Sequence, residues 1–175
     1  MDMLQSIQPL LDWISAHPQW AGLVVFLVAA SESLVVVGIL VPGVVLMTGV
    51  GALIGLGTLD FWSCMFWATM GAIVGDGVSY WLGVHFHRQI QSLWPMSRYP
   101  ELVPKGEAFF KKHGGKSVFF GRFIGPIRAI IPTIAGIMEM PPARIYLVNV
   151  LSAILWAHVV ILPVAVLGVS FTVAS

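Results

Sequence analysis

An apolar stretch of 38 residues covers positions 20–57 and contains a single charged side chain. A helix needs about 20 apolar residues to cross a bilayer, so this stretch is too long for one straight helix and short for two. Pro42 and Gly43 interrupt it, and four further glycines follow. We therefore predict a spanning helix at about 20–38 and a re-entrant hairpin at about 40–57. Two ordinary helices joined by a tight turn are the alternative.

The composition indicates that this chain folds in a lipid bilayer. Hydrophobic residues make up 58% of the 175 residues and charged residues 10%, whereas soluble domains average about 45–50% and about 25%. The mean hydropathy of +0.90 agrees. The sequence predicts an all-α membrane protein in which residues 1–175 form a single domain.

The remaining segments follow from the same pattern of apolar runs and breaks. We expect an amphipathic surface helix at 1–18, a spanning helix at 59–84, a loop with a short helix at 85–116, a second re-entrant hairpin at 117–138 and a spanning helix at 141–172. Together these give about three spanning helices and two re-entrant hairpins. Each half then pairs a spanning helix with a broken segment, which suggests an inverted repeat.

The polar loop at 85–116 holds six of the nine basic residues. Such a bias is typical of a cytoplasmic loop. Binding of nucleic acid is disfavoured, because Glu101 and Glu107 interrupt the basic residues and apolar segments flank the loop. If each hairpin returns to its own side, the N-terminus lies inside and the C-terminus outside.

Four charged side chains fall within apolar segments: Glu32, Asp76, Arg122 and Arg128. Each costs roughly 2.5–3.5 kcal/mol at the centre of a bilayer on insertion scales. Acids and bases are equal in number, so one interpretation is that they pair and hold the helices together. The interpretation we favour is that they line a polar cavity.

The two arginines suit a phosphate ligand. On one continuous helix their spacing of six residues would set the side chains some 120° apart. Gly125 and Pro126 break the segment between them, which permits convergence. Each guanidinium offers a rigid fork of donors that matches phosphate oxygens. We therefore expect Arg122 and Arg128 to bind substrate.

The two acids suit proton coupling or gating. Burial disfavours the charged form of a carboxyl group and a nearby arginine favours it, so we expect Glu32 or Asp76 to exchange protons near neutral pH. Tyr80 follows Asp76 by four residues on the same helix face, which makes its hydroxyl a candidate hydrogen-bond partner.

Metal and enzyme chemistry find little support in the sequence. Cys64 is the only cysteine, and His85 and His87 have no nearby cysteine or acid to complete a metal site. We predict no metal, no cofactor and no enzymatic activity. A membrane lipid phosphatase would need a catalytic histidine in an extramembrane loop, and no Ser-Gly-His signature occurs.

Four pieces of the chain resemble the DedA family, which shares the VTT or SNARE-associated domain. The first is Glu32 followed by Val41-Pro42-Gly43, and the second is Gly71-x-x-x-Gly75-Asp76-x-x-x-Tyr80-x-x-Gly83. The third runs from Phe120 through Gly121-Arg122 and Gly125-Pro126-Ile127-Arg128 to Pro132 and Ala135-Gly136. The fourth is Asn149 with Trp156. The third piece is the most specific. The resemblance implies two facing re-entrant hairpins, with essential acids and arginines at Glu32, Asp76, Arg122 and Arg128.

The resemblance also implies a function in the bacterial inner membrane. It implies that the protein, like members of this family, recycles a polyprenyl-phosphate or phospholipid carrier and depends on the proton motive force. We therefore expect a multi-pass flippase for undecaprenyl phosphate or a phospholipid, with membrane lipids and protons as partners. An uncoupled phospholipid scramblase and a proton-coupled small-ion antiporter are the alternatives. The sequence does not decide whether copies associate into a homo-oligomer.

Overall fold

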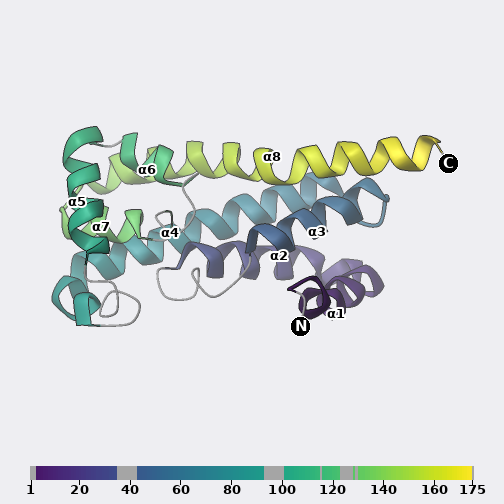
Figure 1. Cartoon of the computed structure of the whole chain (residues 1–175), viewed down its shortest axis with the longest axis horizontal. Coiled ribbons are helices and arrows are strands. Elements are labelled where there is room, and N and C mark those ends of the chain that lie inside the picture. Colours follow the sequence, from purple (N-terminus) through teal and green to yellow (C-terminus); the bar gives the residue numbers. More distant parts are fainter. Residues whose placement is uncertain are drawn as a thin grey trace.

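The computed structural model describes residues 3–34, 43–92, 101–114, 116–122, 128 and 130–174. Within these ranges all regular structure is helical, and it forms an elongated bundle (Figure 1). The helices are α1 (Met3–Ala16), α2 (Pro18–Ser33), α3 (Gly43–Gly55), α4 (Phe61–Ser92), α5 (Leu102–His113), α6 (Lys116–Gly121), α7 (Ile131–Ile137) and α8 (Pro142–Ala174).

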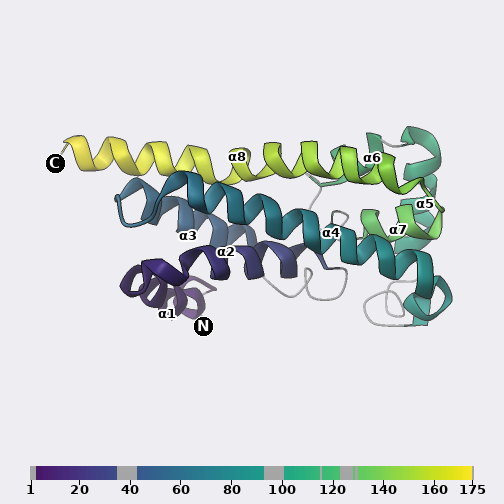
Figure 2. The ribbon, with the colours of Figure 1, turned by 180° about the vertical axis from the view of Figure 1, so that it is seen from behind.

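The long helices α4 and α8 run along the bundle (Figures 1 and 2). α2, α3, α6 and α7 pack against them, whereas α1 packs on α2 and α3, and α5 on α6 and α7. α2 packs on α4, α3 on α8, and α7 on α4. Thus α3, from the first half of the chain, contacts the long helix of the second half, and α7 does the reverse. The inverted repeat expected from hydropathy stays a prediction.

Small residues bring α2 and α4 into close contact. A Cβ atom at Gly75 would lie 2.5 Å from the carbonyl oxygen of Ala30, and one at Gly71 would overlap the carbonyl oxygen of Phe26. Alanines fill the same contact, with Ala29 and Ala72 fully buried. These glycines therefore allow the two helices to approach closely.

Large apolar side chains cover the outer surface of α4 and α8, among them Trp62, Phe66, Leu147 and Leu151. Within the described residues, Pro142–Leu167 of α8 is the helix that is both long and apolar enough to cross a bilayer, with a hydropathy of 2.5. The expected total of about three spanning helices therefore stays a prediction.

The first apolar stretch forms two helices. α2 ends at Ser33 rather than near residue 38, because Leu34 adopts an extended conformation. α3 has 13 residues and so is about 20 Å long, shorter than the roughly 30 Å of a bilayer core. Residues 35–42 lie outside the described residues, and the re-entrant path of 40–57 stays a prediction.

α4 continues to Ser92, but its backbone leaves helical geometry at Phe86 (φ −123°, ψ 27°), so two helical stretches meet there. This break lies next to residue 85, where the sequence placed the start of the polar loop. The second helical stretch was not expected, because hydropathy marks where the apolar surface ends and not where a helix ends.

The expected short helix in this loop is α5, which begins at Leu102 and ends at Gly114, a residue with φ 57°. Lys111, Lys112 and His113 lie in its last turn, where cations favour the helix dipole. The predicted short helix in this loop is therefore confirmed.

The second broken segment consists of α6 and α7, with Arg122 and Arg128 between them. α6 ends at Gly121 and α7 begins at Ile131, so both arginines lie outside these helices. The expected break between the two arginines falls on residues outside the described ranges and stays a prediction. Gly125 and Pro126 themselves lie outside the described residues, and the re-entrant path of 117–138 stays a prediction.

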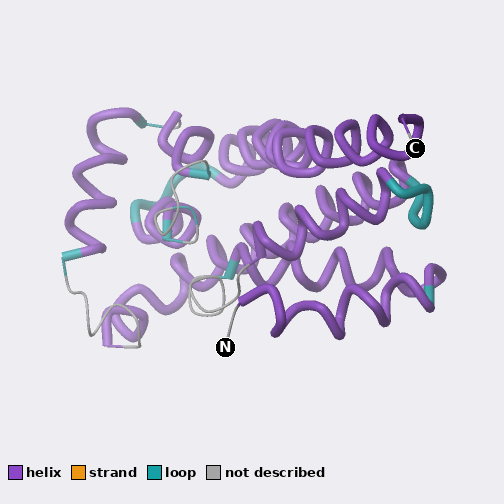
Figure 3. The backbone as a smooth tube through the Cα atoms, turned by 45° about the vertical axis from the view of Figure 1, so that its right-hand side comes forward, coloured by secondary structure: helices purple, strands orange, loops and turns teal. Residues whose placement is uncertain are grey.

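The two ends of the bundle differ. α5 lies at one end, and α1 lies toward the other, where α8 also ends (Figures 1 and 3). If the α5 loop is cytoplasmic, this arrangement would place α1 on the opposite side, whereas the sequence led us to expect the N-terminus inside. The difference comes from α3, which runs back toward the α1 end (Figure 2). The side of the membrane on which the N-terminus lies stays a prediction.

Candidate functional site

The four charged residues singled out in the sequence meet inside the bundle. Glu32 is in the last turn of α2 and Asp76 in the middle of α4, whereas Arg122 follows α6 and Arg128 precedes α7. Glu32, Asp76 and Arg122 are 4%, 6% and 5% exposed. Four separate segments therefore bring two acids and two bases into one buried region.

The charges form two ion pairs, and each pair joins the two halves of the chain. Arg122 pairs with Asp76, and Arg128 pairs with Glu32. Each of the four charges that we expected to line a cavity is thus paired with one opposite charge. A charge needs such a partner to be buried at acceptable cost. The pairing fits the interpretation that they hold the helices together, and it also fits a site in which a ligand competes with the acids.

Asn149 and Trp156 of α8 hold the arginines in place. The Asn149 Oδ1 atom accepts a 2.7 Å hydrogen bond from Nη2 of Arg122, and its Nδ2 donates to the carbonyl of Ile73 over 3.2 Å. The Arg128 guanidinium lies 4.6 Å from the centre of the Trp156 ring, a cation–π contact. Each arginine is therefore oriented by a second residue besides its acid.

Asn149 and Trp156 were expected at the site only from the family resemblance. A lone amide in an apolar helix is a signal that could have identified Asn149, since an amide buried among apolar residues needs a polar partner. The sequence could not show whether Trp156 points into the bundle or toward lipid, because tryptophan is common both at membrane interfaces and in packed interiors.

Hydrogen-bonding capacity remains at both arginines. Nη1 of Arg122 and Nη2 of Arg128 are buried and make no hydrogen bond with any described residue, and the same holds for Oε2 of Glu32. Buried charged donors without partners are costly. Two such donors in one region are what an anion with several oxygen atoms, such as a phosphate, would satisfy.

Two buried hydroxyls near the site are also without a partner among the described residues: Ser33 Oγ beside Glu32 in the chain, and Thr133 Oγ1 in α7. The main chain of Ser33 is engaged, since its carbonyl accepts a 2.9 Å hydrogen bond from Ser79 Oγ. Neither hydroxyl was a candidate in the sequence, because serine and threonine in apolar helices usually bond to their own backbone.

Gly43 and Gly136 lie at close contacts that leave no room for a side chain. A Cβ atom at Gly43 would overlap the Glu32 carboxylate, so this glycine leaves room for the acid. A Cβ atom at Gly136 would overlap the carbonyl oxygen of Tyr80 and lie 3.0 Å from Cα of Gly83. Pro42, Gly125 and Pro126 were also expected to support the site, and they lie outside the described residues.

Tyr80 does not bond to Asp76 as the i,i+4 spacing suggested. Its hydroxyl donates a 2.6 Å hydrogen bond to the carbonyl of Met140. Asp76 is instead paired with Arg122. The tyrosine side chain reaches beyond its helix neighbour to the turn before α8, where it ties α4 to that turn.

Metal ligands do not gather in the part of the chain that the structure describes, where no three residues among histidine, cysteine, aspartate and glutamate lie close enough to hold an ion.

The fold and the site define a class: an α-helical membrane protein with buried, mutually paired charges. Residues 41–166 match the VTT domain, which covers most of the chain. The chain belongs to the DedA family of VTT-domain membrane proteins.

The curated relatives come from bacteria. The chain is 34% identical over 170 residues to inner membrane protein YabI of Escherichia coli, covering 97% of this chain and 67% of that protein. It is 32% identical to protein DedA of E. coli, covering 84% and 68%. It is 31% identical to inner membrane protein YqjA of E. coli, covering 81% and 66%. The chain thus spans about two thirds of these relatives. No solved structure matches it.

Proposed function

We propose that this chain is a multi-pass flippase of the bacterial inner membrane that translocates a lipid phosphate carrier, undecaprenyl phosphate or a phospholipid, at the expense of the proton motive force. The observation that carries the proposal is the pair of buried arginines, each ion-paired to an acid and each with an unpartnered donor among the described residues. The names of YabI and YqjA as inner membrane proteins support the location.

Arg122 and Arg128 bind the phosphate in this proposal. Their unpartnered Nη atoms are buried, and the two guanidiniums contact α2, α4 and α8 through their acids, Asn149 and Trp156. A guanidinium remains charged under all physiological conditions, so it attracts a phosphate without needing to take up a proton. Asn149 and Trp156 limit the rotation of the two guanidiniums, which lowers the entropy lost when the phosphate binds.

Glu32 and Asp76 couple this binding to protons. Phosphate and carboxylate compete for the same guanidinium, so a phosphate on Arg128 leaves the Glu32 carboxylate without its counter-ion. The buried acid then takes up a proton, since an unpaired buried carboxylate is costly. By linkage, protonation of Glu32 strengthens phosphate binding by the same factor. The phosphate and the proton therefore enter the site together.

The test is translocation of a fluorescent polyprenyl phosphate in liposomes that contain the purified protein and carry a pH gradient. We expect Arg128→Ala to reduce the rate at least tenfold, because it removes a charge-assisted hydrogen bond worth about 1.5–3 kcal/mol. Arg128→Lys keeps the charge but loses the planar fork, and we expect an intermediate rate. Lys112→Ala, an exposed change on α5, is the matched control. Unchanged translocation in Arg128→Ala would reject the phosphate-binding role.

The same liposomes separate the proposal from its alternatives. A coupled flippase is accelerated when the gradient is imposed in the productive direction and slowed when it is reversed. An uncoupled scramblase moves the lipid equally under both conditions. A small-ion antiporter dissipates the gradient when an ion is present and no polyprenyl phosphate is.

A further inference from the structure

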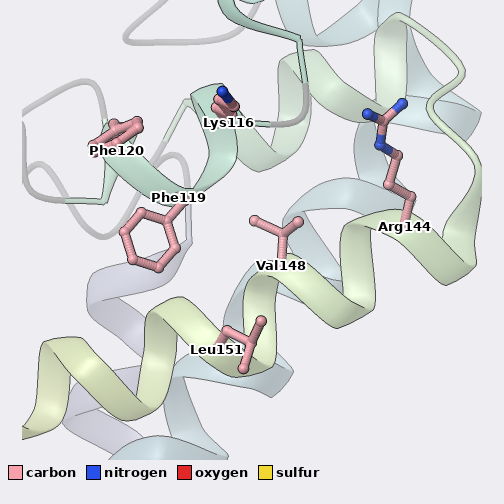
Figure 4. A pocket seen from close by; sticks show the side chains of 6 residues that line it. All are labelled: Lys116, Phe119, Phe120, Arg144, Val148 and Leu151. Atoms are coloured by element: carbon pink, nitrogen blue, oxygen red, sulfur yellow. The ribbon is translucent and has the colours of Figure 1, made fainter.

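A pocket of about 430 Å³ opens between α6 and the first turns of α8 (Figure 4). Its lining comes from two helices: Lys116, Phe119 and Phe120 of α6, and Arg144, Val148 and Leu151 of α8. Neither Arg122 nor Arg128 lines this pocket. It is therefore separate from the buried ion pairs.

The lining is divided by polarity. Figure 4 shows the charged groups of Lys116 and Arg144 at one end of the pocket and Leu151 toward the other. The spacing explains this, because Arg144, Val148 and Leu151 lie at i, i+4 and i+7 on one face of α8 and descend from the polar end into the apolar segment. The pocket thus has a cationic mouth and an apolar floor.

The two cations at the mouth have no acidic counterpart. Both side chains are exposed, and neither forms an ion pair with any described residue. Arg144 lies in the first turn of α8, where the helix dipole disfavours a cation by roughly 0.3–1 kcal/mol. Helix stability therefore does not account for its position, whereas an anion between Lys116 and Arg144 would.

We propose that this pocket binds an anionic phospholipid of the surrounding bilayer. Its phosphate lies between Lys116 and Arg144, and one acyl chain runs along Phe119, Val148 and Leu151. The charge at the mouth selects an anionic headgroup, and the apolar floor selects a ligand with a hydrocarbon chain. The proposal does not rest on the transport role of the buried arginines.

The test is native mass spectrometry of the whole purified protein with added dioleoyl phosphatidylglycerol, and with dioleoyl phosphatidylcholine as the neutral comparison. A basic residue near a lipid surface contributes about 1 kcal/mol, or about fivefold in affinity. We expect Lys116→Gln and Arg144→Gln each to weaken phosphatidylglycerol binding about fivefold, and the double variant to weaken it more. Lys112→Gln removes an exposed charge from α5, outside the pocket, and should leave binding unchanged.

Two comparisons decide the class of ligand. Glycerol phosphate, which carries the charge without the chains, should bind at least tenfold more weakly than phosphatidylglycerol if the apolar floor takes part. Equal binding of the two would overturn the lipid assignment. Equal binding of phosphatidylcholine and phosphatidylglycerol, or unchanged phosphatidylglycerol binding in the double variant, would overturn the role of the two cations.

Discussion

Arg122 and Asp76 form an ion pair whose side chains are 4% and 8% exposed. In such a position the two charges depend on each other, because each one alone would lie unpaired in a medium of low polarity. Breaking a buried pair by removing one partner typically costs about 3–5 kcal/mol, whereas replacing both partners can be nearly neutral. Asn149, which also bonds to Arg122, can offset only part of the lost charge.

We therefore predict that Asp76→Asn lowers the thermal stability of the purified protein in detergent strongly, by several kcal/mol. Asp76→Asn combined with Arg122→Gln should recover much of that loss, since neither charge is then left alone. The measurement is the midpoint of thermal unfolding for both single variants and the double variant. If the two losses simply add in the double variant, the residues do not act as a pair.

Trp156 yields a second prediction at this scale. Its ring lies 4.6 Å from the Arg128 guanidinium, and such contacts contribute about 0.5–2 kcal/mol. In the liposome assay we expect Trp156→Leu to lower polyprenyl phosphate translocation by about twofold to thirtyfold, and Trp156→Phe, which keeps an aromatic face, to lower it less. Equal losses in the two variants would mean that the ring acts through its volume alone.

The residues of the site could be predicted from sequence, but their partners could not. Charges in apolar segments stand out because each is costly there, and this signal identified Glu32, Asp76, Arg122 and Arg128. Glu32 and Arg128 are 96 positions apart, so no local spacing could show that they pair with each other. Tyr80 illustrates the same limit, since its partner Met140 is 60 positions away.

At the scale of helices, the contact between α2 and α4 depends on which glycine of α4 faces α2. Gly75 and Gly77 are two positions apart and lie on different faces. A Cβ atom at Gly75 would lie 2.5 Å from the Ala30 carbonyl oxygen, whereas one at Gly77 would have Tyr146 as its nearest neighbour at 3.5 Å, an ordinary contact. The same substitution should therefore have opposite effects at the two positions.

We predict that Gly75→Ala destabilises the protein by about 1–3 kcal/mol, because the helices must move apart to admit the methyl group. Gly77→Ala should be neutral or stabilise by up to about 1 kcal/mol, since alanine is the better helix former. Unfolding midpoints of the two variants in detergent measure the difference. A loss at Gly77 as large as that at Gly75 would contradict the close contact on one face.

Local signals placed several helices correctly. Helices were expected within 1–18 and within 85–116, and α1 and α5 form there. Hydropathy placed the end of the apolar part of α4 at residue 84, and the backbone leaves helical geometry at Phe86 before a second helical stretch that ends at Ser92. The second stretch could not be predicted, because hydropathy reports the length of an apolar surface and not the length of a helix.

For the molecule as a whole, the two halves are joined through the site. α3 packs on α8 and α7 on α4, and each ion pair likewise takes its acid from the first half and its arginine from the second. A movement of one half against the other would therefore have to separate both pairs. In the proposed transport cycle, a phosphate between the arginines would loosen the contact between the halves and so couple substrate binding to their movement.

The last prediction concerns which side of the membrane each end of the bundle faces. α1 lies toward the end of the bundle opposite α5 (Figure 2), and the basic loop favours a cytoplasmic α5. Cys64 is buried and can be replaced by alanine to give a cysteine-free chain. In that background, Gln19→Cys at the start of α2 and Lys111→Cys in α5 place single exposed thiols near opposite ends.

A membrane-impermeant maleimide should label the Gln19→Cys variant in intact spheroplasts, and it should label the Lys111→Cys variant only after the membrane is permeabilised. Exposure of both side chains makes reactivity depend on the side of the membrane and not on burial. Labelling of both variants from the same side would contradict the out-and-back path of α2 and α3. Labelling with the two sides exchanged would keep that path and reverse the orientation, so that the basic loop would face outward against the charge rule.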